Sequence, residues 1–225
     1  ATNWAGAVPV YVAAAPVIDG RLDEPAWAGA TALGPLVDPG MGEADRSPLA
    51  GTFARVAWDD RALYLGFVVP DSAPDAPFGP AETDPHLWER ASAVEVMLQP
   101  GDPGDNREYF ELQYDTAGAA FDTRWDDYNA PITDGPAGKV FGHQGWSSQA
   151  VRKAVVSGRW YSLELAIPFT ALSSSRVAVP PRAGDVWRLN LYAFRDGQRI
   201  ANAWSPLLRQ GNFHRASRFG RIRFE

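Results

Sequence analysis

Short segments of alternating apolar and polar residues, separated by glycine and proline, most constrain the fold of this chain. An alternation with a period of two is typical of a β-strand, whose successive side chains point to opposite faces of a sheet. The 225 residues include 21 glycines and 19 prolines, and no long segment has the 3.6-residue period of an amphipathic helix. The sequence therefore predicts an all-β chain with little helix.

Nine segments have the residue pattern of a strand. They are Phe53–Trp58, Ala62–Val69, Ala93–Gln99, Tyr109–Asp115, Ala119–Trp125, Ser148–Val156, Arg159–Ile167, Asp185–Phe194 and Arg218–Phe224. Asp59-Asp60 and Ser157-Gly158 are typical of the turns that join neighbouring antiparallel strands. We expect one antiparallel β-sandwich of the immunoglobulin or jelly-roll kind, with a single core.

Three connections are long and rich in proline, glycine and aspartate: Gly34–Gly51, Pro70–His86 and Asp126–Gln144. Loops of this length either form the rims of functional sites or are tolerated insertions. Residues 1–225 are expected to form one domain, with residues 1–15 as an N-terminal extension. Trp4 and Trp160 are expected to be exposed.

Charge and composition exclude several classes of function. The chain has 27 acidic and 21 basic residues, so its net charge of −6 repels phosphate backbones and nucleic acid is not an expected partner. It has no cysteine, which excludes disulfides and Cys-ligated zinc. No run of about 18 apolar residues occurs, so we expect no membrane insertion. A monomer is expected.

The alternation also predicts a polar face. In Ala93–Gln99 the apolar side chains Val94, Val96 and Leu98 point one way and Glu95 points the other. If the strands share a sheet, that second face carries Glu95, Glu111, Gln113, Glu164, Arg188 and Asn190. Carboxylates and amides are planar hydrogen-bonding groups that suit sugar hydroxyls. For Glu164 and Arg188 the simpler interpretation is a mutual ion pair across strands.

Short motifs that span residue 16 to the C-terminus resemble, in their order, the family 9 carbohydrate-binding modules. They are Ile18-Asp19-Gly20-Arg21-Leu22-Asp23-Glu24-Pro25-Ala26-Trp27, Val56-Ala57-Trp58-Asp59-Asp60, Leu63-Tyr64-Leu65, Val94-Glu95-Val96, Tyr109-Phe110-Glu111-Leu112, Leu163-Glu164-Leu165-Ala166-Ile167-Pro168-Phe169, Gly184-Asp185-Val186-Trp187-Arg188-Leu189-Asn190, Trp204-Ser205-Pro206 and Arg218-Phe219-Gly220. The resemblance implies a β-sandwich of the group that includes DOMON domains. It implies a non-catalytic binding module, associated with glycoside hydrolases and secreted, periplasmic or at the cell surface.

The resemblance also implies a site in which two aromatic side chains clamp the end of a sugar chain. Trp88, before the Val-Glu-Val strand, matches one aromatic, and Phe213 matches the other, where the family has a tryptophan. Glu95 matches a hydrogen-bonding glutamate of the family. Glu111 and Gln113 stand where sugar-binding members have arginine and asparagine, which changes a donor to an acceptor.

Further aromatic residues border the loop Asp126–Gln144. Trp125 is expected to bind carbohydrate with the clamp, and Tyr128 and Trp146 extend the same rim.

Calcium is a cofactor that the resemblance implies near the start of Ala93–Gln99. Asp71, Asp75 and Asp84 are oxygen ligands of the right type on the loop Pro70–His86. The acidic residue that commonly precedes the Val-Glu-Val strand is missing, since Ala91-Ser92-Ala93 stands there. The alternative interpretation is that these aspartates are solvated turn formers.

Three other functions remain open. The chain is either a sugar-binding module or a sandwich that has lost sugar binding and serves in structure or protein contact. Related DOMON-type domains hold haem, for which Met97 with His86, His143 or His214 supplies candidate ligands. Paired carboxylates such as Glu95 and Glu111 on neighbouring strands are a candidate glycosidase pair.

Overall fold

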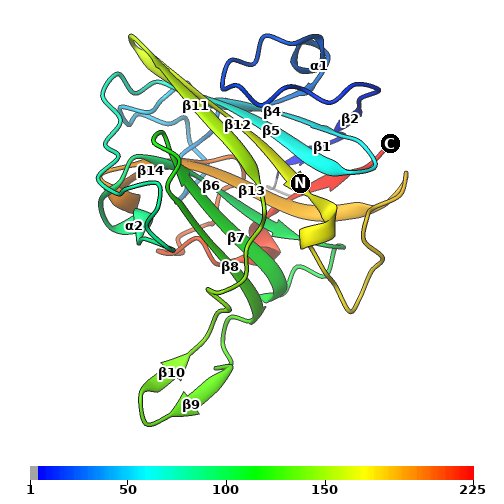
Figure 1. Ribbon diagram of the computed structural model, residues 1–225, viewed down its shortest axis with the longest axis vertical. Helices are drawn as coiled ribbons and strands as arrows, with labels where there is room; N and C mark the ends of the chain where they lie inside the picture. Colours follow the sequence, from blue (N-terminus) through cyan, green and yellow to red (C-terminus); the bar gives the residue numbers. More distant parts are fainter. Residues whose placement is uncertain (1–4) are drawn as a thin grey trace.

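Two β-sheets pack face to face in the computed structural model, which describes residues 5–225 (Figure 1). The first sheet has the order β1 (Gly6–Ala7), β15 (Gly220–Arg223), β13 (Val186–Arg195), β6 (Ala93–Gln99), β7 (Arg107–Asp115) and β8 (Ala120–Asp127), with β14 (Ile200–Ala203) paired to β13. The second has the order β11 (Val151–Ser157), β12 (Trp160–Pro168), β5 (Ala62–Val69), β4 (Phe53–Trp58) and β2 (Val10–Tyr11), with β3 (Thr31–Leu33) paired to β4. The predicted β-sandwich is confirmed.

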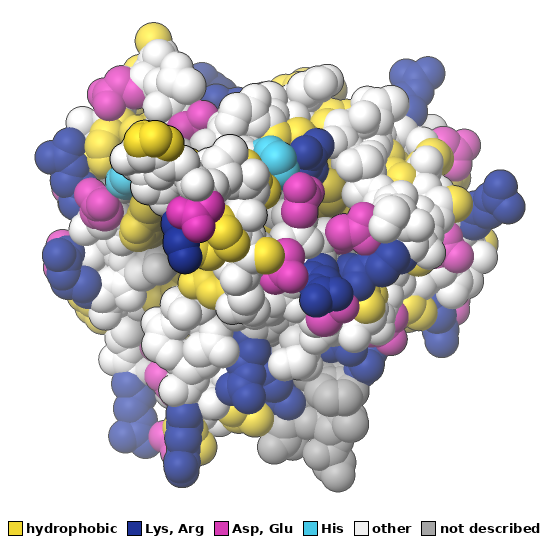
Figure 2. All heavy atoms as spheres, turned by 90° about the horizontal axis from the view of Figure 1, so that it is seen from below, with side chains coloured by type: hydrophobic (Ala, Val, Ile, Leu, Met, Phe, Trp, Pro, Cys, Tyr) yellow, Lys and Arg dark blue, Asp and Glu magenta, His cyan; other side chains and the backbone are white. Residues whose placement is uncertain are grey.

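Helices are few and short in the described part of the chain. They are α1 (Pro25–Ala28), α2 (Leu87–Arg90) and the 3₁₀ turns η1 (Phe169–Ala171), η2 (Gly197–Arg199) and η3 (Ala216–Arg218). None of the helices described is long and apolar enough to cross a membrane. The hairpin of β9 (Thr133–Gly135) and β10 (Gly138–Val140) projects from the sandwich within the long loop expected over Asp126–Gln144 (Figure 1). Seen from the end of the molecule that carries this hairpin, the surface intersperses hydrophobic patches with side chains of both charges (Figure 2).

The apolar members of the alternating pattern fill the space between the sheets. The buried residues of this core include Val94, Val96, Leu98, Leu163, Leu165, Ile167, Leu189 and Leu191. Full burial of one such side chain stabilises the fold by about 1.5–3 kcal/mol. The period-two pattern therefore assigned the inward faces of β6, β12 and β13 correctly.

Most strand bounds agree with the sequence prediction, and the differences have local causes. β4, β5 and β6 form at the predicted bounds. The strand expected from Arg218 begins at Gly220, because η3 occupies the preceding residues. β3 and β14 were not predicted, since three or four residues are too few to show an alternation.

The expected N-terminal extension contributes to both sheets. Gly6 and Ala7 pair in parallel with β15, and Val10 and Tyr11 pair in parallel with β4. Residues 1–4, including Trp4, lie outside the described residues. Trp160 is exposed, with 41% of its surface accessible.

Glu164 does not share a face with the other predicted polar residues, because β12 belongs to the second sheet. Its carboxylate accepts hydrogen bonds from the backbone N–H groups of Asp19, Gly20 and Leu22 at 2.7–2.8 Å. Arg188 instead donates to Asp102, with Nε 2.6 Å from Oδ1. The expected pair of Glu164 with Arg188 is therefore wrong, and Glu164 fastens the N-terminal segment to the sandwich.

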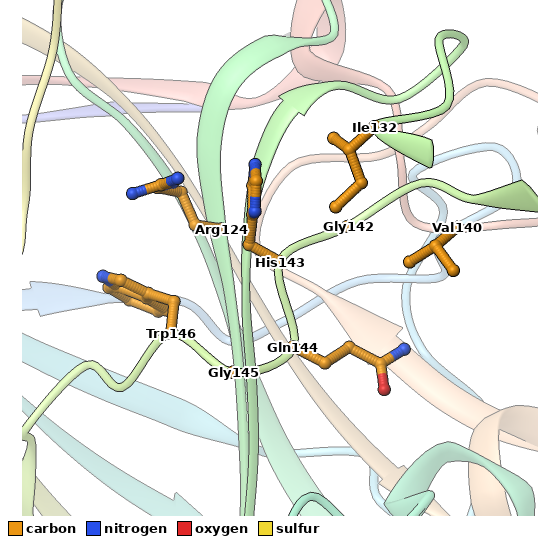
Figure 3. A pocket seen from close by; sticks show the side chains of 8 residues that line it. All are labelled: Arg124, Ile132, Val140, Gly142, His143, Gln144, Gly145 and Trp146. Carbon is orange, nitrogen blue, oxygen red and sulfur yellow. The ribbon is translucent and has the colours of Figure 1, made fainter. Parts of the chain in front are cut away.

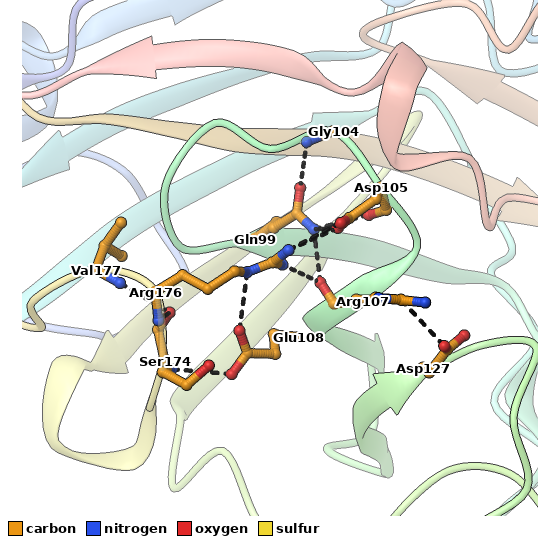
Figure 4. Close-up of polar contacts among 10 residues, drawn as sticks. Gln99, Gly104, Asp105, Arg107, Glu108, Asp127, Ser174, Arg176 and Val177 are labelled. Carbon is orange, nitrogen blue, oxygen red and sulfur yellow. Dashed lines mark hydrogen bonds and ion pairs between the residues drawn. The ribbon is translucent and has the colours of Figure 1, made fainter.

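A polar cluster holds the turn between β6 and β7 (Figure 4). Gln99 Nε2 donates to the carbonyls of Asp105 and Arg107 at 2.8 and 2.7 Å, and Arg176 binds both carboxylate oxygens of Asp105. The next residue in this turn, Asn106, donates to the carbonyl of His214 at 3.0 Å. The turn thereby positions the C-terminal loop over the outer face of the first sheet.

Candidate functional site

The outer face of the first sheet is covered by a second cluster of aromatic residues. Glu95, Glu111 and Gln113 lie on this face, as the alternation predicted, but Glu95 and Gln113 have no exposed surface. The buried aromatic side chains of the cluster are Tyr109, Phe121, Tyr192, Phe194, Phe213 and Phe219. The polar face is therefore the floor beneath an aromatic layer, and of these three residues Glu111 alone has exposed surface.

Glu95, Glu111 and Gln113 form a hydrogen-bonded network. Gln113 Nε2 donates to Glu95 Oε1 at 2.9 Å and to Glu111 Oε1 at 3.1 Å. Gln198 Nε2 donates to Glu95 Oε2 at 2.9 Å, and Trp125 Nε1 donates to Glu111 Oε2 at 2.9 Å. Burial, together with the neighbouring Glu111, raises the pKa of Glu95 well above its ordinary value. Burial thus favours the protonated form of Glu95.

A cavity of about 320 Å³, here called the Trp88 pocket, opens above this network. Its lining residues are Trp88, Glu111, Phe121, Trp125, Tyr128, Gln144, Gln198, Asn212, Phe213 and His214. The volume lies at the lower end of the range of small-molecule sites. The structure brings four predicted site residues together here, namely Trp88, Glu111, Trp125 and Phe213. Glu95 and Gln113 do not line the pocket and support its floor from below.

Trp88 and Phe213 are the two aromatics expected to clamp a ligand. The Trp88 ring stacks on His86, with a centroid distance of 4.3 Å, and meets the edge of Phe121 at 4.6 Å. The Phe213 ring lies parallel to Tyr192, with a centroid distance of 4.0 Å and an interplanar angle of 3°. Since Phe213 is buried and Trp88 is half-buried, Trp88 offers the larger free aromatic surface.

The opposite wall consists of Trp125, Tyr128 and His214. The rings of Tyr128 and His214 stack at 4.4 Å, and the Tyr109 hydroxyl lies 2.6 Å from His214 Nδ1. His214 Nε2 lies 3.5 Å from Glu111 Oε2. Burial lowers the pKa of His214, against the opposing effect of Glu111. This favours a neutral imidazole in the wall of the pocket.

The sequence did not indicate Gln198, Asn212 or Gln144 as lining residues. Gln198 lies in η2 and the other two lie in loops, so no periodic pattern assigns their direction. Gly197 brings η2 close to α2, since a Cβ there would lie 2.4 Å from the Trp88 carbonyl oxygen. This left-handed glycine, with φ of 59°, is the local signal that two segments meet here.

The haem candidates are not arranged around a common cavity. Met97 is fully buried in the aromatic cluster. His86 Nδ1 lies 3.1 Å from Glu89, and His143 Nε2 lies 2.6 Å from Asp126. With His214 bound to Tyr109, each histidine already has a hydrogen-bonding partner.

The three aspartates predicted to hold calcium occupy different environments. Asp71 is buried, Asp75 is exposed and Asp84 is half-buried. Among residues 5–225, the acidic and histidine side chains gathered closely enough to hold an ion are Asp19, Glu24 and Glu164, which do not include these three. Glu164 already accepts three backbone hydrogen bonds there.

Asp71 and Asp115 are both buried, and both act electrostatically on the same residue, Tyr161. Asp71 Oδ2, Asp115 Oδ2 and the Tyr161 hydroxyl are buried, and none of them has a hydrogen-bond partner among the described residues. Burial raises the pKa of Tyr161, and the charges of Asp71 and Asp115 raise it further. Two carboxylate oxygens and a phenol oxygen are hard donors that fit Ca²⁺.

Solved structures with the same fold cover nearly the whole chain, although no protein of curated description matches it. A presumed carbohydrate-binding protein from Bacteroides uniformis is 20% identical, with a TM-score of 0.72, over 99% of this chain and 100% of that one. A family 9 carbohydrate-binding module from Caldicellulosiruptor kristjanssonii is 16% identical. Its complex with glucose has a TM-score of 0.60 over 96% of this chain and 95% of that one. Its complex with cellotriose has a TM-score of 0.62 over 97% of this chain and 93% of that one.

A family comparison gives the sequence evidence. The family described as "Carbohydrate family 9 binding domain-like" matches residues 18–225. This match includes both β-sheets apart from β1 and β2, and it includes every residue that lines the Trp88 pocket. The chain therefore belongs to the carbohydrate family 9 binding domain-like family.

Proposed function

We propose that the Trp88 pocket binds the end of a carbohydrate chain without cleaving it. The observation that carries this proposal is a small cavity with aromatic walls above a hydrogen-bonding floor, in a member of a carbohydrate-binding family. The similar module from Caldicellulosiruptor kristjanssonii was solved with glucose and with cellotriose. Both comparisons support a sugar as the ligand class.

The chemistry of the pocket suits a neutral sugar. The Trp88 ring offers a flat apolar surface for the C–H face of a sugar ring. Glu111 and Gln198 supply acceptors and donors for hydroxyl groups at the floor. The pocket lining contains no lysine or arginine among the described residues, so a sugar carboxylate would meet Glu111 without a compensating positive charge.

The buried carboxylates favour binding over catalysis. In most glycosidases two carboxyl groups stand on either side of the scissile bond. Here one amide group, that of Gln113, bridges Glu95 and Glu111, and Glu95 has no exposed surface. The pair belongs to the hydrogen-bonded floor of the site, and family membership supports a non-catalytic module.

The substitution Trp88→Ala tests this function. Calorimetric titration with glucose, xylose and their β-1,4-linked oligomers is expected to show weak binding by the natural chain and a loss of at least about tenfold in affinity for the variant. Trp160→Ala is the matched control, because Trp160 is exposed on the other sheet. Circular dichroism checks that Trp88→Ala remains folded. Unchanged affinity in this variant would place the site elsewhere, and the absence of any glycan ligand would favour a structural or protein-contact role.

We also propose that Asp71 and Asp115 hold a structural calcium ion. The support is the pair of unpartnered buried carboxylate oxygens described above. A cation there would offset the cost of burying two carboxylates. Asp75 and Asp84, the other two candidate ligands in the sequence, are not needed for this set.

A melting experiment tests the calcium proposal without a glycan. Calcium is expected to raise the melting temperature relative to a chelator, because a ligand that binds only the folded state stabilises it. The double variant Asp71→Asn with Asp115→Asn is expected to lose this difference, whereas Asp75→Asn keeps it. A natural chain that melts at the same temperature in both solutions, or a double variant that still responds, would contradict the proposal.

A further inference from the structure

A second hollow lies at the base of the projecting hairpin, across the edge strand β8 from the Trp88 pocket (Figure 3). This hairpin hollow has a volume of about 620 Å³. Its side chains include Arg124, Ile132, Val140, His143, Gln144 and Trp146. Gln144 lines both the hollow and the Trp88 pocket. The two cavities therefore share one side chain at the edge of the first sheet, while Arg124 and Trp125, consecutive on β8, point to opposite faces and line one cavity each.

The wall between the cavities is fixed to the edge of the first sheet. The His143 N–H donates to the Arg124 carbonyl at 2.9 Å, and the Arg124 N–H donates back at 3.4 Å. Gly142 permits this close approach, because a Cβ at its position would lie 2.4 Å from Thr123 Cγ2 and 3.3 Å from the Trp125 ring. The segment that carries Gln144 is thus held against β8 by pairing and packing.

One side of the hairpin hollow is apolar and preorganised. Trp146 Nε1 donates to the Ala171 carbonyl at 3.1 Å, and its ring packs on Phe110 with a centroid distance of 4.8 Å. These contacts fix the indole before any ligand arrives, which reduces the entropy lost on binding. Ile132 and Val140 from the hairpin add apolar surface, and Val140 is exposed.

The other side carries Arg124 and Gln144, whose side chains make no hydrogen bond with the rest of the described chain. Arg124 Nε lies 3.6 Å from Asp126 Oδ1, and no hydrogen bond joins the Arg124 side chain to another described residue. Asp126 Oδ2 is taken by His143 Nε2 at 2.6 Å. The Gln144 side chain is exposed. A guanidinium and an amide beside a fixed aromatic ring match the hydroxyl groups and the C–H face of a sugar.

We propose that the hairpin hollow is a second sugar subsite, which takes the sugar rings that follow the chain end held in the Trp88 pocket. This inference rests on the proposed function of that pocket, and it names the ligand class as an oligosaccharide of several rings. A single chain that occupies both cavities would pass around the edge strand β8 at Gln144, the side chain that lines both of them. The gain in affinity comes from linking two adjacent sites through one ligand.

A ladder of chain lengths tests the second subsite. The probes are glucose and xylose with their β-1,4-linked pentamers, measured by calorimetric titration. The natural chain is expected to bind one pentamer about tenfold more tightly than its monosaccharide. The double variant Ile132→Ser with Val140→Ser is expected to keep the monosaccharide affinity and to lose most of the gain with length. Arg124→Gln is expected to lose part of the gain.

A matched control and the separate outcomes complete the test. Val156→Ser changes an exposed valine on the second sheet and is expected to behave as the natural chain. The second subsite is contradicted if the natural chain binds monosaccharide and pentamer with equal affinity, or if the gain in affinity persists in the double variant. Neither result contradicts sugar binding in the Trp88 pocket. No binding of any of the four probes overturns the proposed function, and the second subsite with it.

Discussion

At the scale of single residues, burial decides the role of each polar group on the outer face of the first sheet. Glu111 on β7 lines the Trp88 pocket. Glu95 on β6 pairs with Gln113, two residues further along β7, and has no exposed surface. The alternation placed both residues on the same face correctly. It did not reveal that Phe213 lies within the aromatic layer above them, because Phe213 is in a loop segment without periodicity.

The substitution Glu95→Gln is expected to change how stability depends on pH. The pKa of Glu95 is raised in the folded chain, so its contribution to stability is fully present below the unfolded pKa and is lost as pH rises through the folded pKa. Glutamine cannot lose a proton there. The variant should therefore gain stability relative to the natural chain as pH rises from the unfolded pKa to the folded pKa.

Denaturant unfolding from pH 4 to 9 measures this difference. Glu89→Gln is the control, because Glu89 is exposed on α2. Parallel stability curves for the natural chain and Glu95→Gln would contradict the raised pKa.

At the scale of secondary-structure elements, the sequence predicted strands and faces well and sheet membership poorly. The pattern Leu163-Glu164-Leu165 shows that Glu164 points away from the core, but either sheet satisfies that pattern. Only the pairing of β12 with β5 shows that Glu164 belongs to the second sheet, whereas the Trp88 pocket lies on the first. The same limit applies to Gln198, whose short turn has no periodicity and is positioned by its contact with α2.

The segment from Gly142 to Gln144 gives an element-scale prediction. In Gly142→Ala the new Cβ would meet Thr123 Cγ2 at 2.4 Å, so the segment must lift from β8. Hydrogen exchange at the His143 amide is expected to become faster, since that amide bonds to the Arg124 carbonyl. Overpacking of this kind costs about 1–3 kcal/mol.

Gly145→Ala serves as the control, because no atom lies within 4 Å of a Cβ at that position. Equal exchange rates at His143 in the two variants would show that the segment does not depend on the close approach at Gly142.

At the scale of the whole molecule, the sandwich supplies a rigid support and the long connections supply the site. The core between the sheets involves the inward faces, while the Trp88 pocket draws on α2, β8, η2 and the loop after Asn212. The resemblance in the sequence points to Trp88 and Phe213, and both line the Trp88 pocket. The second wall, with Tyr128 and His214, depends on the turn at Asn106 and required the folded chain.

The crystal structure of a complex with cellopentaose or xylopentaose tests the central claim most directly. We predict a terminal sugar ring stacked on Trp88, with hydroxyl groups in hydrogen-bond contact with Glu111 or Gln198. The following sugar rings would pass Gln144 toward Trp146. A sugar chain bound on another face, with the Trp88 pocket free of sugar, would contradict the claim that this pocket is the carbohydrate site.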